Sequence, residues 1–416
     1  MRLIVQKYGG TSVATPERIC NVARRIIETQ REGCRVVAVI SAMAGVTDEL
    51  IKLARAVSPH PTDRELDILL ATGEHAATAL TTMAVNALGG TAISLTGAQA
   101  GILTDRNHSK ARIANISPKQ IHEMLSEDYI VIVAGFQGQT PEGETTTLGR
   151  GGSDLTAIAL AGALNADVCQ IFTDVDGVFT CDPRAVLAAK KLDEIAYDEL
   201  LEMASAGSKV VQSRAVEFAK KFGVEFEVRS TFNRRAGTIA KEETTSMEDV
   251  VIRGISLDRH QAKLTIAGVR DEPGIAGRIF SNIAAAHIIV DMIVQNASIG
   301  GTTDISFTIH EDELENARKI LMPVVGEIGA KRLNTASGMA KLSVVGIGMR
   351  SHSGVAAHLF ECLGKAGINI QLVSTSEIKI AVIIDEKDAE RAAQLIHAEF
   401  GLAGLVPAAR GTAALA

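Results

Sequence analysis

Apolar residues in the first part of the chain form short continuous runs separated by stretches with helical periodicity. The runs are rich in β-branched residues and do not alternate with polar ones, which is typical of strands covered by helices on both faces. The predicted strands are Leu3–Lys7, Val36–Ser41, Ala92–Leu95, Ile130–Ala134, Val168–Thr173 and Val224–Arg229. This pattern predicts an α/β sandwich with a largely parallel sheet.

The stretches between these runs carry helix signals. Thr15 is a good N-cap, and Pro16 suits the first position of a helix. The predicted helices are Pro16–Thr29, Glu65–Leu88 and Ser153–Leu164. We expect the second of them to be interrupted near Gly73, because glycine weakens a helix interior.

A polar stretch, Lys241–Asp249, reads as a linker, and the sequence after it repeats itself. The matching segments are Lys263–Val269 with Lys341–Ile347, Pro273–Gly274 with Ser353–Gly354, and Ile288–Asp291 with Ile368–Gln371. Each unit reads as a ferredoxin-like βαββαβ module, with chance similarity of two short α/β units as the alternative. The predicted domains are residues 1–245, 250–335 and 336–405, with 406–416 as a tail. Val250–Ser256 also fits the last strand of the second module, which would interlock the two.

Composition narrows the class of protein. The chain has 416 residues, 46% hydrophobic and 22% charged, with a net charge of -7 that offers no basic surface for nucleic acid. Its five cysteines are odd in number and lack metal or redox spacing, which fits reduced thiols. The N-terminus lacks a signal-peptide core, and no apolar run reaches membrane-spanning length. We therefore expect a cytoplasmic protein that does not act at a membrane.

Two glycine loops each connect to a predicted helix. Lys7–Ser12 (KYGGTS) follows the first strand, where backbone N–H groups and the Lys7 ammonium suit a phosphate. A strand followed by two glycines is more often plain structure, and the Walker A spacing is absent. Gly149–Asp154 (GRGGSD) adds Arg150, which can bind a carboxylate through two hydrogen bonds. Asp154 suits a substrate ammonium or Lys7, or simple helix capping.

Two further motifs resemble known binding sites only in part. Thr173–Phe179 (TDVDGVF) contains an Asp-Val-Asp-Gly sequence similar to part of a calcium loop, but the EF-hand glutamate and helices are missing. A loop facing a nucleotide fits it better. Gly346 and Gly348 lack the third glycine of a dinucleotide-binding fingerprint, so no such site is predicted.

Together the motifs resemble one family, the aspartokinases. They are KYGGTSV at Lys7–Val13, SAM at Ser41–Met43, TGE at Thr72–Glu74, GRGGSD at Gly149–Asp154 and TDVDGVFTCDPR at Thr173–Arg184. The resemblance covers Leu3 to about Leu402 and implies the amino acid kinase fold, an eight-stranded open αβα sandwich. The repeated half resembles the tandem ACT modules of those enzymes. Tyr8, Phe179 and Cys181 depart from the common residues without removing a charge.

The resemblance implies phosphorylation of L-aspartate by ATP with Mg²⁺, in lysine, threonine and methionine biosynthesis. It implies Lys7 and Asp154 as catalytic residues, with Mg²⁺ held by ATP rather than by protein ligands. The implied aspartate pocket contains Ser41, Thr47, Glu74, Arg150, Gly151, Gly152 and Ser153, with Glu74 on the ammonium and Arg150 on the α-carboxylate. The implied ATP site contains Lys7, Tyr8, Gly9, Gly10, Thr173, Asp174, Phe179, Asp182, Arg184 and Lys209.

The ACT resemblance implies feedback inhibition by lysine, threonine or both. One side of the implied effector pocket is Asp271, Glu272, Pro273, Gly274, Ile275 and Ala276, with Asp291 and Gln295. The facing side is Val355, Asn369, Ile370, Thr375 and Ser376. Without the resemblance, Pro273–Gly274 reads as a turn. Met247 resembles the internal start of a small subunit in some relatives, so the assembly would be a homodimer through the ACT domains or α2β2.

Other functions stay open on the sequence. The nearest is an amino acid kinase for glutamate, acetylglutamate, carbamate or a nucleotide, although those enzymes lack the doubled ACT tail. Another is an amino acid sensor that binds ATP without catalysis, which intact Lys7, Arg150 and Asp154 argue against. A fusion to homoserine dehydrogenase is excluded by the chain length and the missing dinucleotide fingerprint.

Overall fold

The structure is a computed structural model that describes residues 1–149, 151–207, 210–244, 251–296, 300–350, 352 and 354–403. Its contacts divide the chain into two compact units. The first, called the kinase unit after the family it resembles, consists of Met1–Val178, Lys191–Ala204 and Lys209–Thr245. The second, called the regulatory unit after its resemblance to ACT modules, consists of Phe179–Lys190, Ser205–Ser208 and Ser246–Ala416. Each unit is described by itself.

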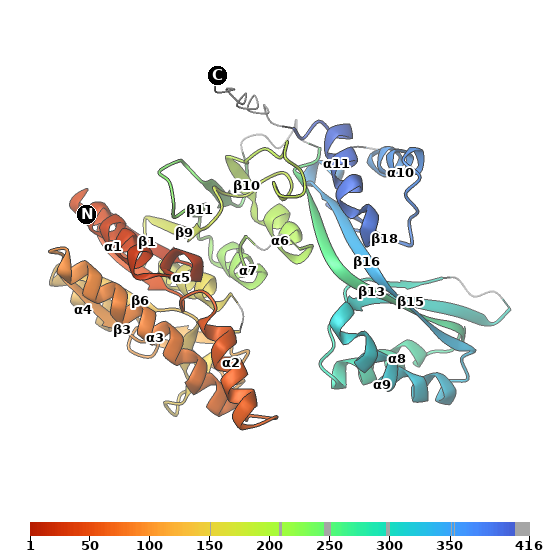
Figure 1. Ribbon diagram of the computed structural model, residues 1–416, viewed down its shortest axis with the longest axis horizontal. Coiled ribbons are helices and arrows are strands. Elements are labelled where there is room, and N and C mark those ends of the chain that lie inside the picture. The colour runs from red at the N-terminus through yellow and green to blue at the C-terminus, as the bar shows by residue number, and fades with distance from the viewer. Residues whose placement is uncertain are drawn as a thin grey trace, which may run out of the picture. The chain divides into compact units, whose positions relative to one another are not determined.

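The kinase unit is built on an eight-stranded sheet in the order β10-β12-β11-β9-β1-β2-β6-β3 (Figure 1). The strands are β1 (Leu3–Tyr8), β2 (Arg35–Ile40), β3 (Ala92–Leu95), β6 (Ile130–Ala134), β9 (Val168–Thr173), β10 (Glu194–Ala196), β11 (Phe226–Ser230) and β12 (Thr238–Lys241). Neighbouring strands are parallel except β11 and β12. The predicted sandwich with a largely parallel sheet is confirmed.

Helices cover both faces of this sheet. On one face α1 (Pro16–Arg31) and α3 (Asp63–Ala87) share an apolar cluster with β2 and β6. On the other, α5 (Gly152–Ala163) packs on β1, β2 and β9, beside α7 (Ser213–Phe222). The strands are buried from both sides, which explains their continuous apolar runs.

The helices α1 and α3 follow the predicted signals in part. Thr15 caps α1 by accepting a hydrogen bond from the Arg18 N–H, and Pro16 is the first helical residue, as predicted. The expected interruption near Gly73 is wrong, because α3 runs unbroken through it. A Cβ at Gly73 would lie 3.1 Å from the Ala42 Cβ, so the glycine lets the helix approach the loop after β2.

Smaller elements surround the rim of the sheet. A four-stranded sheet in the order β5-β4-β7-β8 was not predicted from the sequence. Its strands are β4 (Ile102–Thr104), β5 (Ile113–Ile116), β7 (Gln137–Gln139) and β8 (Thr145–Thr147). The other helices of this unit are α2 (Val46–Val57), α4 (Lys119–Ser126) and α6 (Tyr197–Ser205), whose last residue belongs to the regulatory unit. None of the residues of α2 is buried.

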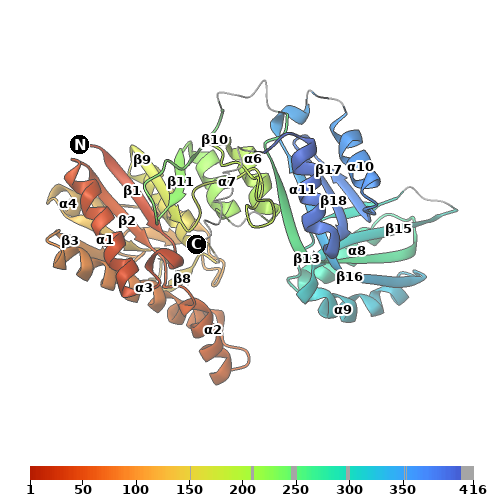
Figure 2. The same ribbon diagram turned by 45° about the horizontal axis from the view of Figure 1, so that its top comes forward.

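The regulatory unit contains a six-stranded antiparallel sheet in the order β14-β15-β13-β16-β18-β17. Its strands are β13 (Gly254–Arg270), β14 (Ile293–Gln295), β15 (Thr302–His310), β16 (Arg332–Val345), β17 (Leu372–Thr375) and β18 (Lys379–Asp385). Its helices are α8 (Ile275–Ala285), α9 (Leu314–Glu327), α10 (Val355–Lys365) and α11 (Ala389–Glu399). Figure 2 shows the helices grouped as α8 with α9 and α10 with α11.

Both repeats share the two long strands. β13 and β16 pair from Gly254 opposite Val345 at one end to Ala267 opposite Arg332 at the other. The start of β13 therefore completes the sheet of the second repeat, and the start of β16 completes that of the first. The repeats interlock, and each has its own apolar core. Phe179–Lys190 contributes Cys181, Ala185 and Val186 to the core of the second repeat.

Candidate active site

The C-terminal ends of the parallel strands β1 and β2 place the first glycine loop. Lys7 is aligned with Val39 and Tyr8 with Ile40, so both strands end at the same edge of the sheet. The loop turns there against the Ser41–Ala44 segment, and the Ala44 N–H donates to the Gly10 carbonyl at 3.2 Å. A Cβ at Gly10 would lie 2.7 Å from the Ala42 carbonyl oxygen, so this approach requires glycine.

A buried ion pair joins the two glycine loops. Lys7 Nζ lies 2.6 Å from Asp154 Oδ1, and the two side chains are 12% and 9% exposed. Asp154 belongs to the first turn of α5, and its other oxygen accepts the Gln212 N–H at 3.3 Å. The sequence left several roles open for Asp154, and the geometry favours holding the Lys7 ammonium in place.

A pocket of about 370 Å³ opens beside this pair, within the kinase unit. Of the seven predicted aspartate-binding residues, six line it: Ser41, Thr47, Glu74, Gly151, Gly152 and Ser153. Lys7 and Gly10 line it as well. The seventh, Arg150, lies outside the described residues. Residues far apart in the sequence thus form one wall, with the Lys7 ammonium at its edge.

Glu74 supplies the buried negative charge of this pocket. It lies on α3 and is 4% exposed, and its Oε1 accepts the Ala42 N–H at 3.2 Å. Its Oε2 is buried without a hydrogen-bond partner among the described residues. Burial raises the pKa of Glu74 to about 7, so the empty pocket holds a carboxylate that an ammonium group would stabilise.

Comparisons with known proteins agree with this geometry. A model of the amino acid kinase family matches residues 2–230, and an ACT domain model matches 264–322 and again 342–400. The aspartate kinase of Stutzerimonas stutzeri is 51% identical over 403 residues, which cover 97% of this chain and 98% of the relative. The aspartokinase of Mycolicibacterium smegmatis is 47% identical over 409 residues, covering 97% of each.

The chain belongs to the aspartokinase family. The structure of Escherichia coli aspartokinase III in complex with aspartate and ADP aligns with a TM-score of 0.81 at 26% identity, covering 95% of this chain and 99% of that one. The same enzyme in complex with lysine and aspartate aligns with a TM-score of 0.77 at 26% identity, covering 96% and 99%. The predicted class of enzyme, a kinase with tandem ACT domains, is confirmed.

The aspartokinase residues predicted to bind ATP are divided between the two units. Thr173 and Asp174 end β9 in the kinase unit, where the Thr173 hydroxyl donates to Asp174 at 3.2 Å. Phe179, Asp182 and Arg184 belong to the regulatory unit. There, hydrogen bonds from Arg184 lower the pKa of the Asp182 carboxyl, which keeps it ionised. Lys209 lies outside the described residues.

Tyr8 is a core residue rather than a surface one. Its ring is fully buried and stacks on Phe172 with centroids 4.7 Å apart. Burial also raises the pKa of its hydroxyl, which donates to Gln6 Oε1 at 3.1 Å. A nucleotide contact from Tyr8 would therefore come from its backbone.

The predicted effector residues fall into two groups around the N-termini of α8 and α10. Gly274 and Gly354 cap these helices with φ of 90° and 98°, as expected for equivalent positions in two repeats. Asp291, predicted to line the effector pocket, forms an ion pair with the buried Lys341 of the second repeat. Conversely, Lys263 of the first repeat donates to Gln371 of the second at 2.8 Å.

Gln295 and Thr375, one from each group, lie far apart within one chain. Across the sheet, Gln295 aligns through β15 and β13 with Leu333 of β16. Thr375 aligns through β18 with Val344, eleven residues further along the same strand. At about 3.3 Å per residue, these positions are about 35 Å apart. Figure 1 shows α8 and α10 near opposite ends of the β13–β16 pair.

Some residues of the site were missed by reasoning from the sequence. Ser109 and Thr147 line the same pocket, and both are held by the buried Asp67. Ser109 lies outside every predicted motif, and Thr147 lies just before the second glycine loop, Gly149–Asp154, without belonging to it. The sequence signal that could have indicated them is Asp67, an aspartate within an apolar stretch of a predicted helix.

Among the residues that the structure describes, no helix combines the length and the apolar character needed to cross a bilayer.

Proposed function

We propose that this aspartokinase transfers the γ-phosphoryl group of ATP to the side-chain carboxylate of L-aspartate, which gives ADP and 4-phospho-L-aspartate. The observation that carries the proposal is the Lys7–Asp154 pair at the edge of a pocket that holds Glu74. The Lys7 ammonium would lie between an anionic donor and an anionic acceptor. The E. coli relative has been solved in complex with aspartate and ADP, which supports this choice of ligands.

The acceptor pocket matches an amino acid in charge. Glu74 would bind the substrate ammonium, whose charge would lower the raised pKa of this carboxyl. Ser41, Thr47 and Ser153 supply hydroxyl groups, and Gly151 and Gly152 leave room for the substrate backbone. Arg150 remains the predicted partner of the α-carboxylate.

The chemistry needs no general base, because a carboxylate acceptor is already ionised at pH 7. The obstacle is repulsion between two anions, so alignment and positive charge supply the catalysis. Lys7, held by Asp154, would stabilise the phosphoryl group as it moves. The carboxylate nearest Lys7 is committed to the ion pair, so Mg²⁺ would be held by the ATP phosphates and would neutralise part of their charge. Tyr8, Gly9, Gly10, Thr173, Asp174, Phe179, Asp182, Arg184 and Lys209 remain the predicted nucleotide contacts.

We further propose that lysine, threonine or both inhibit the enzyme by binding to the ACT repeats, as feedback in lysine, threonine and methionine biosynthesis. The E. coli relative has been solved with lysine and aspartate, which supports lysine as a candidate. Because Gln295 and Thr375 lie about 35 Å apart in one chain, a complete pocket would combine the α8 side of one copy with the α10 side of another.

The assembly would accordingly be at least a dimer, through the ACT repeats. A homodimer and an α2β2 form both satisfy this geometry, and the internal start at Met247 lies outside the described residues. We place the enzyme in the cytoplasm, where ATP and aspartate are available.

Trapping of the product tests the reaction. The enzyme is incubated with ATP, Mg²⁺, L-aspartate and hydroxylamine, and both ADP and hydroxamate are measured with and without lysine plus threonine. We expect aspartate-dependent hydroxamate that decreases when both amino acids are present. ADP release without hydroxamate, or hydroxamate from glutamate or acetylglutamate but not from aspartate, would contradict the proposed acceptor.

A further inference from the structure

Asp67 is a fully buried carboxylate in the first turns of α3, outside every predicted motif. It accepts hydrogen bonds from His108 Nδ1 at 2.8 Å and from the Ser109 N–H, 3.0 Å from each oxygen. The Thr147 hydroxyl also donates to it. A buried charge is tolerated when it is hydrogen-bonded in this way, so Asp67 fixes these three residues in place.

Ser109 is held in an unusual conformation. Its φ is 65°, in the left-handed region that residues other than glycine rarely adopt. The two short contacts from its N–H to Asp67 account for how this conformation is kept. Its carbonyl oxygen would lie 3.3 Å from a Cβ at Gly149, so Ser109 borders the second glycine loop.

The Ser109 hydroxyl is unsatisfied. Its Oγ is buried and lacks a hydrogen-bond partner in the part of the chain that the structure describes. Among the described residues that line the pocket, Glu74 is the other with a buried polar atom in this state. The pocket lining therefore offers an acceptor to an ammonium and a donor to a carboxylate, which are the two groups of an amino acid.

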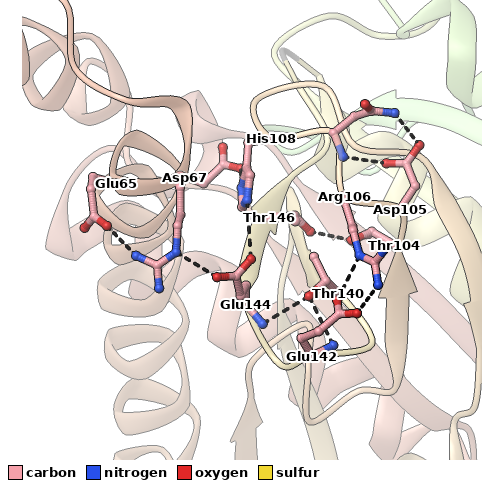
Figure 3. Close-up of polar contacts among 12 residues, drawn as sticks. Glu65, Asp67, Thr104, Asp105, Arg106, His108, Thr140, Glu142, Glu144 and Thr146 are labelled. Carbon is pink, nitrogen blue, oxygen red and sulfur yellow. Dashed lines mark hydrogen bonds and ion pairs between the residues drawn. The ribbon is translucent and has the colours of Figure 1, made fainter.

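The same carboxylate is linked outward to the protein surface. His108 Nε2 lies 3.8 Å from Glu144, which accepts from Arg64 Nε at 2.8 Å (Figure 3). These contacts join the start of α3, the loop after β4 and the β7–β8 hairpin. The wall that carries Ser109 is thus fixed from three elements.

We propose that Ser109 is a further substrate-binding residue, whose hydroxyl donates to a carboxylate of the acceptor amino acid, and that Asp67 is its positioning residue. This assignment rests on the proposed function, because it takes the acceptor to be an amino acid. A serine hydroxyl changes its aim by rotation about χ1 alone, so a carboxylate in the pocket can capture it. Bound substrate would give the hydroxyl the acceptor it lacks.

Two substitutions at Ser109 separate the effect of the hydroxyl from the effect of the backbone conformation. Both Ser109→Ala and Ser109→Gly remove the hydroxyl, but glycine adopts a positive φ without cost. A hydrogen bond to a charged group contributes roughly 1.5–3 kcal/mol, so both variants should raise the aspartate KM by roughly 10-fold or more. The kcat and the ATP KM should stay within about twofold, because uniform substrate binding alone is lost.

Asp67→Asn tests the positioning role. It should raise the aspartate KM as well, and adding Ser109→Ala to it should raise KM little further, because the two changes break one interaction. Thr146→Val is the matched control. It removes a buried hydroxyl from the Thr104–Thr146 contact of 2.6 Å in the neighbouring sheet and should leave the aspartate KM unchanged.

The outcomes are distinguishable from failure of the proposed function, because the unaltered enzyme is assayed in parallel. An active parent with unchanged aspartate KM in Ser109→Ala overturns this assignment, as does a wild-type KM in Ser109→Gly alone. Additive effects of Asp67→Asn and Ser109→Ala overturn the positioning role. A parent that does not turn over aspartate overturns the proposed function, and this assignment with it.

Discussion

The kinase unit and the regulatory unit bring distant residues together in opposite ways. In the first, Lys7, Ser41 and Glu74 surround one pocket of a single chain. In the second, the loops before α8 and α10, which hold predicted effector residues of the two sides, lie at opposite ends of one strand pair. The difference teaches that one chain forms the pocket of the kinase unit, whereas the proposed effector pocket would combine two chains.

The direction of the strands explains this contrast. Parallel strands end at the same edge, so the loops after β1 and β2 meet there. β13 and β16 are antiparallel, so the helices that follow them, α8 and α10, start at opposite ends. Duplication of an ACT module within one chain thus places the loops before α8 and α10 at opposite ends of the shared strands.

The largest effect is expected at Lys7. Lys7→Ala should lower kcat by roughly 10³-fold, because a positioned cation at a transferring phosphoryl group acts mainly in the transition state. The aspartate KM should change little. Steady-state ADP release measures both constants, and Asp48→Ala, an acidic pocket residue without a proposed role, is the control. Near-normal kcat in Lys7→Ala would remove Lys7 from the catalytic residues.

The next effect concerns stability and pH. The pKa of Glu74 is raised from 4.5 to about 7, so the folded protein binds a proton more tightly than the unfolded chain. Stability is therefore lost as pH rises from about 4.5 to 7. Glu74→Gln, which does not ionise, should be more stable than the parent by about 3 kcal/mol above pH 7, and equally stable near pH 4. Urea unfolding of the substrate-free enzymes at both pH values checks this.

The same substitution should weaken substrate binding. Glu74→Gln should raise the aspartate KM by roughly 30-fold with a smaller change in kcat, because it removes a buried partner of the ammonium. In the parent, kcat/KM for aspartate should fall about tenfold per pH unit below pH 7, as Glu74 is protonated. The variant should lack that dependence. A variant with the same pH profile as the parent would assign the titration to another group.

The smallest effect is expected at the link between the repeats. Lys263→Met removes one partly buried hydrogen bond to Gln371 and should lower the free energy of unfolding by about 1 kcal/mol. Lys341→Met should cost more, because it leaves Asp291 without its ion pair. Thermal unfolding monitored with and without lysine compares the two. Equal effects would mean that the buried ion pair adds nothing beyond a hydrogen bond.

The sequence was sufficient for much of the fold. The runs that became β3, β6 and β9 were predicted with the bounds the structure gives, because strands buried on both faces need uninterrupted apolar residues. Gly9 and Gly10 indicated the loop after Lys7, because only glycine lets the backbone approach a neighbouring segment so closely. The break near Gly73 was predicted wrongly, because helix propensity was outweighed by packing against Ala42.

Other features depended on contacts that leave no local signal. Asp67 is 41 residues from His108 and 80 from Thr147, and nothing in the spacing joins them. The sequence also placed Phe179–Lys190 within the first domain, whereas its contacts place it in the regulatory unit. The Thr180 hydroxyl there lies 2.9 Å from His397 of α11, and burial lowers the pKa of that histidine.

Mixed dimers test most directly that catalysis is complete in one chain and the effector pocket is shared by two. Asp271→Ala and Thr375→Ile each alter one side of the pocket, so each homodimer should resist inhibition by lysine plus threonine while keeping aspartate-dependent hydroxamate formation. A dimer with one chain of each kind pairs two intact sides in one of its pockets, and it should regain part of the inhibition. Mixed dimers that stay as resistant as the two parents would contradict a pocket shared between chains.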